Sequence, residues 1–300
     1  FVGVHPAFCM PHLGNLQRDG RYRRPMDDIT PEEAPTEDGR PLDGQVCLIV
    51  GAGEGIGRAC AEAFVREGAT VALVARDAQR LTDLAADIEA STGGRAHPVA
   101  ADLGEPDVGR RVVDAVMATL GRIDSVIAVA TMAGRGALID VDMDQLRRAF
   151  EVNVIGTLDV SRCAARTMVD AGLGGAIVHV STLGTHSLPE RQAPYTATKA
   201  AMVSASMTMA KELGPEGIRV NVVTPGYVTG APLDQLCEHA AAKDGLDAAD
   251  VSRRLASTAA LRRHVDPADL AQAALFLAGS SGRNITGIEL RVDGGQKVGP

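Results

Sequence analysis

The sequence predicts an α/β fold in which a parallel sheet is flanked by helices. Two observations support this prediction. Short apolar runs alternate with longer segments of helical periodicity, and the first apolar run ends in a glycine-rich turn that opens a helix. Strands that alternate with helices form a parallel sheet joined by right-handed crossovers. The chain has 300 residues, of which 45% are apolar, and this is enough for one large domain with a full core.

Residues 1–44 differ in composition from the rest of the chain. They carry six of the fifteen prolines and show no sustained apolar period. We expect a Pro-rich, partly irregular N-terminal extension, followed by a single folded domain over residues 45–300. Two interpretations of the extension remain open: a segment that wraps the domain or a neighbouring subunit, and a loosely ordered tail.

The predicted strands are short apolar runs, typical of strands that are buried on both faces. They span residues 46–50, 70–75, 96–101, 125–130, 176–181, 218–223 and 288–292. The predicted helices show apolar residues at helical spacing. They run from the glycine turn to about residue 67, and over about 77–93, 105–121, 142–171, 193–213 and 266–277.

The segment 227–264 is long for a connection and mixes leucines with many charges. It follows a strand at the sheet edge where ligands bind in open α/β folds. We therefore predict a mobile lid, with Leu233 and Leu236 on a helical face over the substrate. The alternative is a helical insertion that makes subunit contacts only.

The turn after the first strand reads Gly-Ala-Gly-Glu-Gly-Ile-Gly. Glycines let the backbone approach a pyrophosphate closely, and the N-terminus of the following helix favours the negative charge. The pattern predicts a dinucleotide site. Its predicted contacts in this turn are Gly51, Gly53, Glu54, Gly55, Ile56 and Gly57.

Arg76 follows the second strand, where a basic side chain favours the 2′-phosphate of NADP and an acidic one favours NAD. NADP(H) is therefore the favoured cofactor. Glu54 and Asp77 add negative charge nearby, and an Arg76–Glu54 ion pair is an alternative, so NAD(H) remains possible.

Tyr195 and Lys199 lie four residues apart on a predicted helix, which puts their Cβ atoms on one face about 6 Å apart. A nearby ammonium favours the phenolate and lowers the pKa of a tyrosine. Tyr195 is thus a candidate proton donor and acceptor. Ser181 ends the preceding strand and can offer a hydroxyl to the same reacting oxygen.

The composition excludes several classes of protein. The formal net charge of −8 argues against a nucleic-acid-binding protein, and no stretch is apolar enough to predict a membrane span. Five scattered cysteines indicate a reduced, cytoplasmic chain. His5, Cys9 and His12 lack the spacing of metal ligands, so no metal site is predicted.

Several motifs occur in an order that resembles the short-chain dehydrogenase/reductase family. They are Gly51-x-x-x-Gly55-x-Gly57, Asp102-Leu103, Asn153-Val-Ile-Gly, Val180-Ser181, Tyr195-x-x-x-Lys199, Arg219-Val-Asn-Val-Val-Thr-Pro-Gly226 and Val292-Asp-Gly-Gly295. The resemblance covers about residues 45–296. It implies one Rossmann-type domain with a seven-stranded parallel sheet of order 3-2-1-4-5-6-7, usually in a homotetramer or homodimer. It also implies NAD(P)-dependent interconversion of a secondary alcohol and a ketone.

The resemblance assigns a catalytic tetrad of Asn153, Ser181, Tyr195 and Lys199. Ser181 would orient the substrate oxygen, Tyr195 would transfer the proton, Lys199 would hold the ribose and lower the pKa of Tyr195, and Asn153 would hold a water. Asp102 and Leu103 would bracket the adenine. The implied cofactor contacts beyond the glycine turn are Arg76, Asp102, Leu103, Ala130, Tyr195, Lys199, Pro225, Gly226 and Val228.

One departure concerns the stretch after the fourth strand. The family often has Asn-Asn-Ala-Gly there, whereas this chain has Thr131-Met-Ala-Gly134, so a stabilising asparagine is missing. Two other functions remain open: a 3-oxoacyl-thioester reductase, and a cofactor-binding sensor without turnover. His179 is predicted to be a packed side chain, and His186 is a candidate substrate contact.

Overall fold

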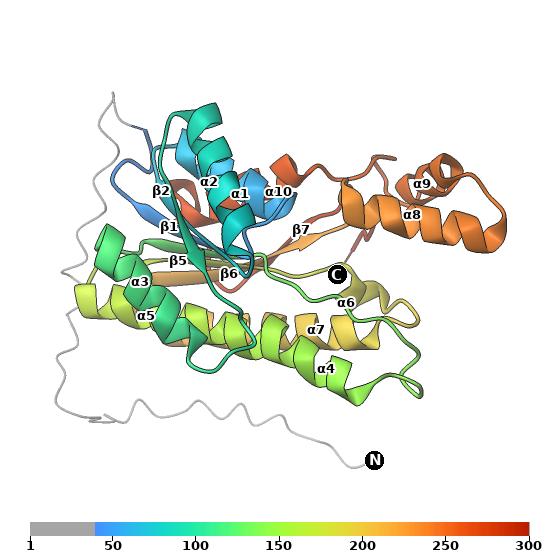
Figure 1. Cartoon of the computed structure of the whole chain (residues 1–300), viewed down its shortest axis with the longest axis horizontal. Helices are drawn as coiled ribbons and strands as arrows, with labels where there is room; N and C mark the ends of the chain where they lie inside the picture. Colours follow the sequence, from blue (N-terminus) through green and yellow to red (C-terminus); the bar gives the residue numbers. More distant parts are fainter. Residues whose placement is uncertain (1–39, 300) are drawn as a thin grey trace, which may run out of the picture. The chain divides into compact units, whose positions relative to one another are not determined.

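The protein is described by a computed structural model that covers residues 40–299 (Figure 1). Its centre is a seven-stranded sheet of order β3-β2-β1-β4-β5-β6-β7, with every neighbouring pair parallel. The strands are β1 (Val46–Val50), β2 (Thr70–Ala75), β3 (Ala96–Ala100), β4 (Ser125–Ala128), β5 (Gly175–Val180), β6 (Ile218–Pro225) and β7 (Glu289–Val292). The predicted fold class and strand order are confirmed.

Helices cover both faces of the sheet, as Figure 1 shows. One layer contains α1 (Ile56–Arg66), α2 (Ala78–Thr92) and α10 (Pro267–Ala278). The opposite layer contains α3 (Val108–Leu120), α5 (Thr157–Ala171) and α7 (Ala193–Leu213). Because both faces are covered, the central strands β1, β2 and β4 are almost entirely apolar and buried.

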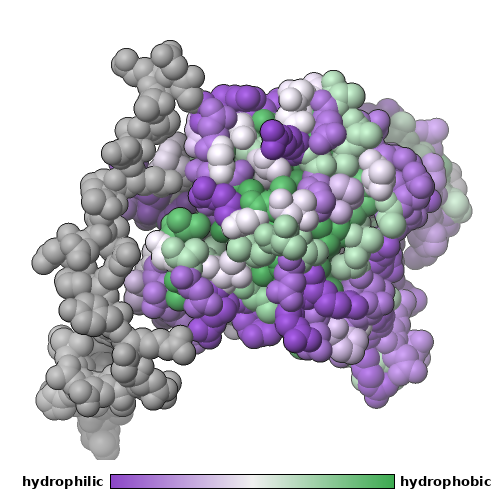
Figure 2. All heavy atoms as spheres, turned by 60° about the vertical axis from the view of Figure 1, so that its left-hand side comes forward, coloured by the Kyte–Doolittle hydropathy of each residue, from purple (hydrophilic) through white to green (hydrophobic). Residues whose placement is uncertain are grey.

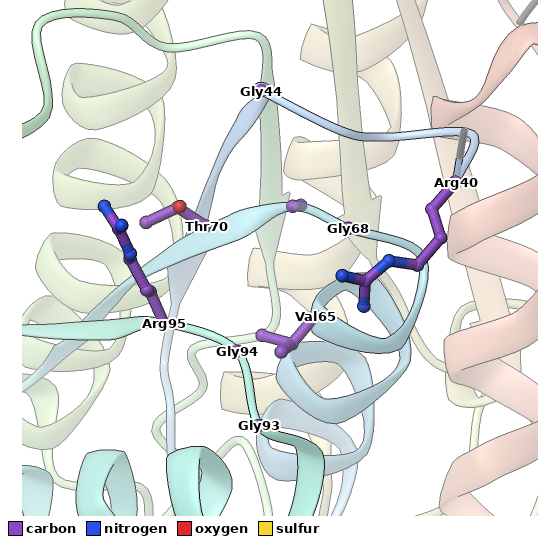
Figure 3. A pocket seen from close by; sticks show the side chains of 9 residues that line it. Arg40, Gly44, Val65, Gly68, Thr70, Gly93, Gly94 and Arg95 are labelled. Carbon is purple, nitrogen blue, oxygen red and sulfur yellow. The ribbon is translucent and has the colours of Figure 1, made fainter. Parts of the chain in front are cut away.

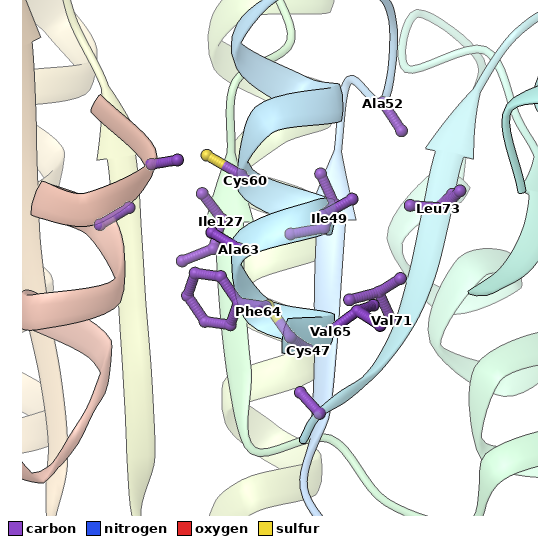
Figure 4. Packing of buried hydrophobic residues seen from close by; sticks show 14 of the residues in the cluster. Cys47, Ile49, Ala52, Cys60, Ala63, Phe64, Val65, Val71, Leu73 and Ile127 are labelled. Carbon is purple, nitrogen blue, oxygen red and sulfur yellow. The ribbon is translucent and has the colours of Figure 1, made fainter. Parts of the chain in front are cut away.

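The core is aliphatic, as expected for a chain without tryptophan. Successive strand residues point to opposite faces, so Ile49 packs under α1 and α10 while Leu48 packs toward α3 and α5. In Figure 4, α1 lies against β1 with Phe64 near Ile49 and Cys47, while Leu73 lies further away on β2; all four side chains are fully buried. This packing fixes α1, and with it the glycine turn that precedes it.

Three regions differ from the predicted elements. The helix predicted over 142–171 is divided into α4 (Met143–Phe150), a π-helical segment (Glu151–Gly156) and α5. The segment predicted as a mobile connection contains α8 (Ala231–Asp244) and α9 (Ala248–Ala256), and a short helix α6 (Gly184–Ser187) precedes α7. The apolar spacing alone does not distinguish a π-helical turn from an α-helical one, so the sequence could not reveal the interruption.

Residues 1–39, including His5, Cys9 and His12, lie outside the described residues, so the predicted irregular extension stays a prediction. Within residues 40–44, Leu42 is buried in the core and its amide donates to the carbonyl of Glu67. Polar side chains cover much of the surface in Figure 2, and apolar ones gather toward the middle of that face. No helix within residues 40–299 has both the length and the apolar character needed to cross a membrane.

Candidate active site

The glycine turn lies at the carboxyl end of β1, against the end of β4. Gly51 has φ +92°, and a Cβ there would overlap the backbone nitrogen of Ala130. A Cβ at Gly57 would lie 2.5 Å from the carbonyl oxygen of Gly51. These two glycines are therefore required by packing within the chain itself.

Gly53 and Gly55 differ, because a Cβ at either position would meet no atom within 4 Å. Gly55 is the N-cap residue of α1, and no side chain caps the free N–H groups of that helix. An open backbone surface beside uncapped N–H groups suits a phosphate group. The turn therefore fits the pyrophosphate of a dinucleotide.

Glu54 and Arg76 do not form the alternative ion pair. Glu54 is mostly exposed and lies 3.4 Å from Arg58, which also pairs with Glu62 at 2.9 Å and Asp87 at 3.5 Å. Glu54 pairs with Arg58 rather than with Arg76 because Arg58 lies only four residues, about one helical turn, after Glu54. Arg76 is exposed at the end of β2 and has no ion-pair partner among residues 40–299.

Asp102 and Leu103 lie just beyond the end of β3. The carboxylate of Asp102 accepts from the Gly104 amide at 2.9 Å and from Arg148 Nη2 of α4 at 2.7 Å. Leu103 is buried against the α3–α5 layer. The turn is thus held in place before any ligand binds.

Lys199 is buried beneath the carboxyl ends of β4 and β5. Its ammonium donates to the carbonyl of Val180 at 2.8 Å and to that of Ala130 at 3.5 Å. Burial lowers the pKa of Lys199 to about 8. Ala130 also packs against Gly51. The glycine turn and Lys199 of the Tyr195 helix therefore both contact Ala130.

Asn153 lies in the π-helical segment and is fully buried. Its Oδ1 accepts from the Met132 amide at 2.5 Å, while its Nδ2 donates to the Met132 carbonyl at 2.9 Å and to Thr198 Oγ1 at 3.0 Å. The amide thus fixes the stretch after β4 that lacks the family's asparagines. It also joins that stretch to the residue before Lys199.

Ser181 follows β5, and its Oγ is buried without a hydrogen-bond partner in the described part of the chain. A buried hydroxyl is rarely left unpaired, so the site is built to receive an oxygen or nitrogen atom from a ligand. The amide of Ser181 donates to Val223 at 2.9 Å, which fixes the backbone from which the hydroxyl projects.

Tyr195 lies in the first turn of α7, after Pro194. Burial raises the pKa of Tyr195, and hydrogen bonding with the Thr182 and Thr131 side chains partly offsets this. The expectation that Lys199 lowers the pKa of Tyr195 is therefore not met in this structure, because the ammonium is directed at backbone carbonyls. The two threonines were missed, although Thr182 adjoins Ser181 and Thr131 lies in the divergent stretch.

Pro225 ends β6, and Gly226 continues from it with an amide that donates to Val292 at 3.1 Å. A Cβ at Gly226 would lie 2.9 Å from Gln296 and 3.0 Å from Asp293 Cα, so glycine is required there. Val228 forms a parallel bridge with Val265. These residues lie at the same edge of the sheet as Ser181.

The two histidines near the site have other partners. His179 is buried between Ser161 Oγ at 2.9 Å and Ser206 Oγ at 2.8 Å, and burial and the charge of Lys199 lower its pKa to about 4. His186 lies 2.9 Å from Glu289 of β7. The structure therefore supports the packed role for His179, whereas the substrate contact of His186 stays a prediction.

The predicted apolar lid surface is wrong. Leu233 is buried with Cys237, Ala241 and Val251, and Leu236 packs beside them, so the apolar faces of α8 and α9 cover each other. Leu233 and Leu236 are therefore used in packing between α8 and α9. The predicted change in mobility on ligand binding stays a prediction.

A hollow lies at the amino ends of β1, β2 and β3, which is the end of the sheet opposite to the glycine turn. It is lined by glycines and by Arg40 and Arg95, with a volume of about 340 Å³. Figure 3 shows the two guanidinium groups pointing in different directions, so they do not converge on one anion. This hollow is not a candidate site.

Residues 51–297 match the family described as "Enoyl-(Acyl carrier protein) reductase". The L-rhamnose 1-dehydrogenase (NAD(P)(+)) of Sphingomonas sp. (strain SKA58) is 34% identical over 258 residues, which cover 86% of this chain and 98% of that protein.

Two solved structures are also similar. L-sorbose reductase from Gluconobacter frateurii, complexed with NADPH and L-sorbose, has a TM-score of 0.82 and 28% identity, covering 87% of this chain and 99% of that one. NAD+-bound xylitol dehydrogenase has a TM-score of 0.79 and 28% identity, covering 85% of this chain and 99% of that one.

Proposed function

The chain belongs to the short-chain dehydrogenase/reductase family and is an NAD(P)-dependent oxidoreductase of secondary alcohols and ketones, and on this premise we propose that Tyr195 is its acid–base residue. The single observation that carries the proposal is the unpaired, buried Oγ of Ser181, beside the Thr182 that partners Tyr195. A hydroxyl donor and a phenol at one point are what a reacting carbonyl or alcohol oxygen requires.

The dinucleotide supplies the hydride acceptor or donor when it is bound. The turn with Gly53 and Gly55 would hold its pyrophosphate, and Asp102 its adenine. At the reacting oxygen, Ser181 Oγ donates a hydrogen bond and Tyr195 Oη gives or takes the proton. Because burial raises the pKa of Tyr195, the phenol is protonated at neutral pH and ready to act as an acid in ketone reduction.

Lys199 and Asn153 would act around these two groups. Asn153 holds Met132 and Thr198, so it keeps the end of β4 and the α7 helix in register. Lys199 carries a positive charge below its pKa of about 8 and places it under the end of β5. That charge favours negative charge on an oxygen bound beside Ser181.

We favour NADP(H) as the cofactor, since Arg76 is exposed and without an ion-pair partner in residues 40–299, and Glu54 pairs with Arg58 instead of Arg76. The relatives differ on this point: sorbose reductase is complexed with NADPH and xylitol dehydrogenase is bound to NAD+. NAD(H) is therefore the alternative.

We propose a sugar or a polyol as the substrate, on the strength of the relatives that act on rhamnose, sorbose and xylitol. The test is turnover of the purified protein with NAD+ and NADP+ and a panel of polyols and aldoses. Reduction of the dinucleotide with a member of the panel supports the proposal. Turnover only of 3-oxoacyl thioesters with the reduced dinucleotide, or binding without any turnover, would replace it by one of the two alternatives.

A homo-oligomer is also proposed. A groove of about 1280 Å³ runs from the loop before α3 across the π-helical segment, α5 and α7, and Ile155, which is 55% exposed, lines it. The groove is lined by the basic side chains of Arg162 and Arg166 and by the acidic side chains of Glu212 and Glu216. Two copies of the groove can therefore pair opposite charges with each other. Light scattering at micromolar concentration should give a particle mass that is a multiple of the chain mass. I155E should lower this mass. A monomeric wild type would contradict the proposed homo-oligomer.

A further inference from the structure

Arg148 of α4 contacts the turn that follows β3, although the two are far apart in the sequence. Its Nη2 donates to Asp102 Oδ2 at 2.7 Å, and its Nη1 donates to the Gly104 carbonyl at 3.1 Å. The two Nη groups of one planar guanidinium therefore hold Asp102 and Gly104, the two ends of the turn after β3. Such a fork is specific to arginine, because lysine carries a single point donor.

Gly104 is shaped to accept this guanidinium. A Cβ at this position would collide with the guanidinium group of Arg148. The φ angle of Gly104 lies outside the left-handed region, so the backbone conformation does not require glycine there. The absence of a side chain at Gly104 instead makes room for the Arg148 guanidinium. The close fit at Gly104 and the ion pair with Asp102 are made by the same guanidinium.

The carboxylate of Asp102 is oriented from two sides. The Gly104 amide donates to Oδ1 at 2.9 Å while Arg148 donates to Oδ2, so neither oxygen can rotate freely. A carboxylate has about four acceptor positions. Acceptor capacity thus remains on a group whose direction is fixed, which is what recognition of an amino group requires.

The same turn is packed against the far end of the segment that carries Asn153. A Cβ at Gly156 would collide with the carbonyl of Leu103. Arg148 precedes the π-helical segment and Gly156 ends it, so the turn 102–104 is held from both sides of Asn153. The adenine end of the site and the tetrad asparagine therefore share one support.

We infer that Arg148 is a positioning residue that holds Asp102 for the adenine amino group and holds the 102–104 turn against the Asn153 segment. The inference rests on the proposed function, since it assigns the Asp102 region to the adenine of the dinucleotide. Arg148 touches neither the substrate nor the reacting atoms. Its loss must therefore act first on dinucleotide affinity and on the choice of base.

The experiment measures binding of the reduced dinucleotide, by its fluorescence, to wild type, R148Q and R147Q. Arg147 is the matched control, because it is the adjacent arginine, is 69% exposed and pairs only with Asp144 of its own helix among residues 40–299. We expect R148Q to bind about tenfold more weakly, as for the loss of a hydrogen bond to a charged group, and R147Q to bind like wild type.

A second measurement separates positioning from general damage. The hypoxanthine analogue of the dinucleotide lacks the adenine amino group, so wild type should prefer the adenine form and R148Q should lose that preference. D102A, which removes both acceptor oxygens, should lose it as well, and R148Q should cause no further loss of preference in the D102A background. A merely structural arginine would weaken both dinucleotides equally and leave the preference intact.

G104A provides a variant that leaves every charge in place, in case R148Q does not fold. Its Cβ displaces the guanidinium, so the same loss of preference is expected. Unchanged affinity and preference in a folded R148Q or G104A would overturn the inference while leaving the proposed function intact. A wild type that binds neither dinucleotide would instead overturn the proposed function and this inference with it.

Discussion

The carboxyl edge of β4 and β5 and the α8–α9 unit organise their side chains in opposite ways. At the sheet edge, Lys199 and Asn153 are bound to the backbone of other elements, and the Ser181 hydroxyl has no hydrogen-bond partner within residues 40–299. In α8–α9, the apolar faces pack mainly on each other, and Leu233 and Val251 belong to a small core of their own. The first region is fixed by long-range polar contacts and prepared for a ligand. The second is stabilised locally and separately from the main core.

Replacement of the buried ammonium should have the largest effect on the sheet edge. In Lys199→Met, we expect kcat to fall by about 100-fold, as when an electrostatic group is removed from an active site. The pKa of Lys199 falls from 10.5 to about 8 on folding, so the wild type gains stability as pH rises from 8 to 10.5. This gain is about 3 kcal/mol, and the variant lacks it.

Urea unfolding of both proteins at several pH values measures this difference, and other titrating groups cancel in it. A difference in unfolding free energy that stays constant from pH 8 to 10.5 would show that Lys199 is not buried as described.

The separation of the two cores predicts a contrast between two leucine variants. Leu73→Ala and Leu233→Ala each remove a buried side chain, which costs about 2–5 kcal/mol where the site cannot collapse. We expect Leu73→Ala to lower the stability of the whole domain. Leu233→Ala should lower hydrogen-exchange protection in residues 231–256 only.

Hydrogen exchange with mass spectrometry resolves the two patterns. Equal loss of protection across β1, β2 and α7 in Leu233→Ala would mean that α8–α9 is part of the main core, and the comparison would fail.

The exposed arginine at the end of β2 should have the smallest of these effects. Arg76→Ala is expected to weaken NADP(H) binding about tenfold while leaving NAD(H) binding nearly unchanged, since only NADP(H) carries the 2′-phosphate. Titration of both dinucleotides measures this. Equal losses would move the cofactor preference to NAD(H).

The fold and the outline of the site could be predicted because they depend on local patterns. Alternating apolar runs predicted the strands, and the spacing of Tyr195 and Lys199 predicted their shared helix. The strand order came from the family resemblance, since nothing in the spacing of the strands determines it.

The contacts that the sequence could not provide join residues that are distant in sequence or compete for one partner. Glu54 pairs with Arg58 rather than with the alternative Arg76, and His186, a candidate substrate contact, pairs with Glu289 of the last strand. The pKa of Tyr195 moves in the opposite direction to the predicted one because burial outweighs a charge that points elsewhere. The Arg148 fork was missed because its partners lie more than 40 positions away.

The central claim is that Tyr195 Oη transfers the proton at the reacting oxygen, and Tyr195→Phe tests it most directly. The change removes only the hydroxyl, so the reduced dinucleotide should bind with unchanged affinity by fluorescence titration. With a polyol turned over by the wild type, kcat should fall by about 10²–10⁴-fold, which is the contribution of general acid–base catalysis. A variant that binds the dinucleotide and retains near-native kcat would contradict the account.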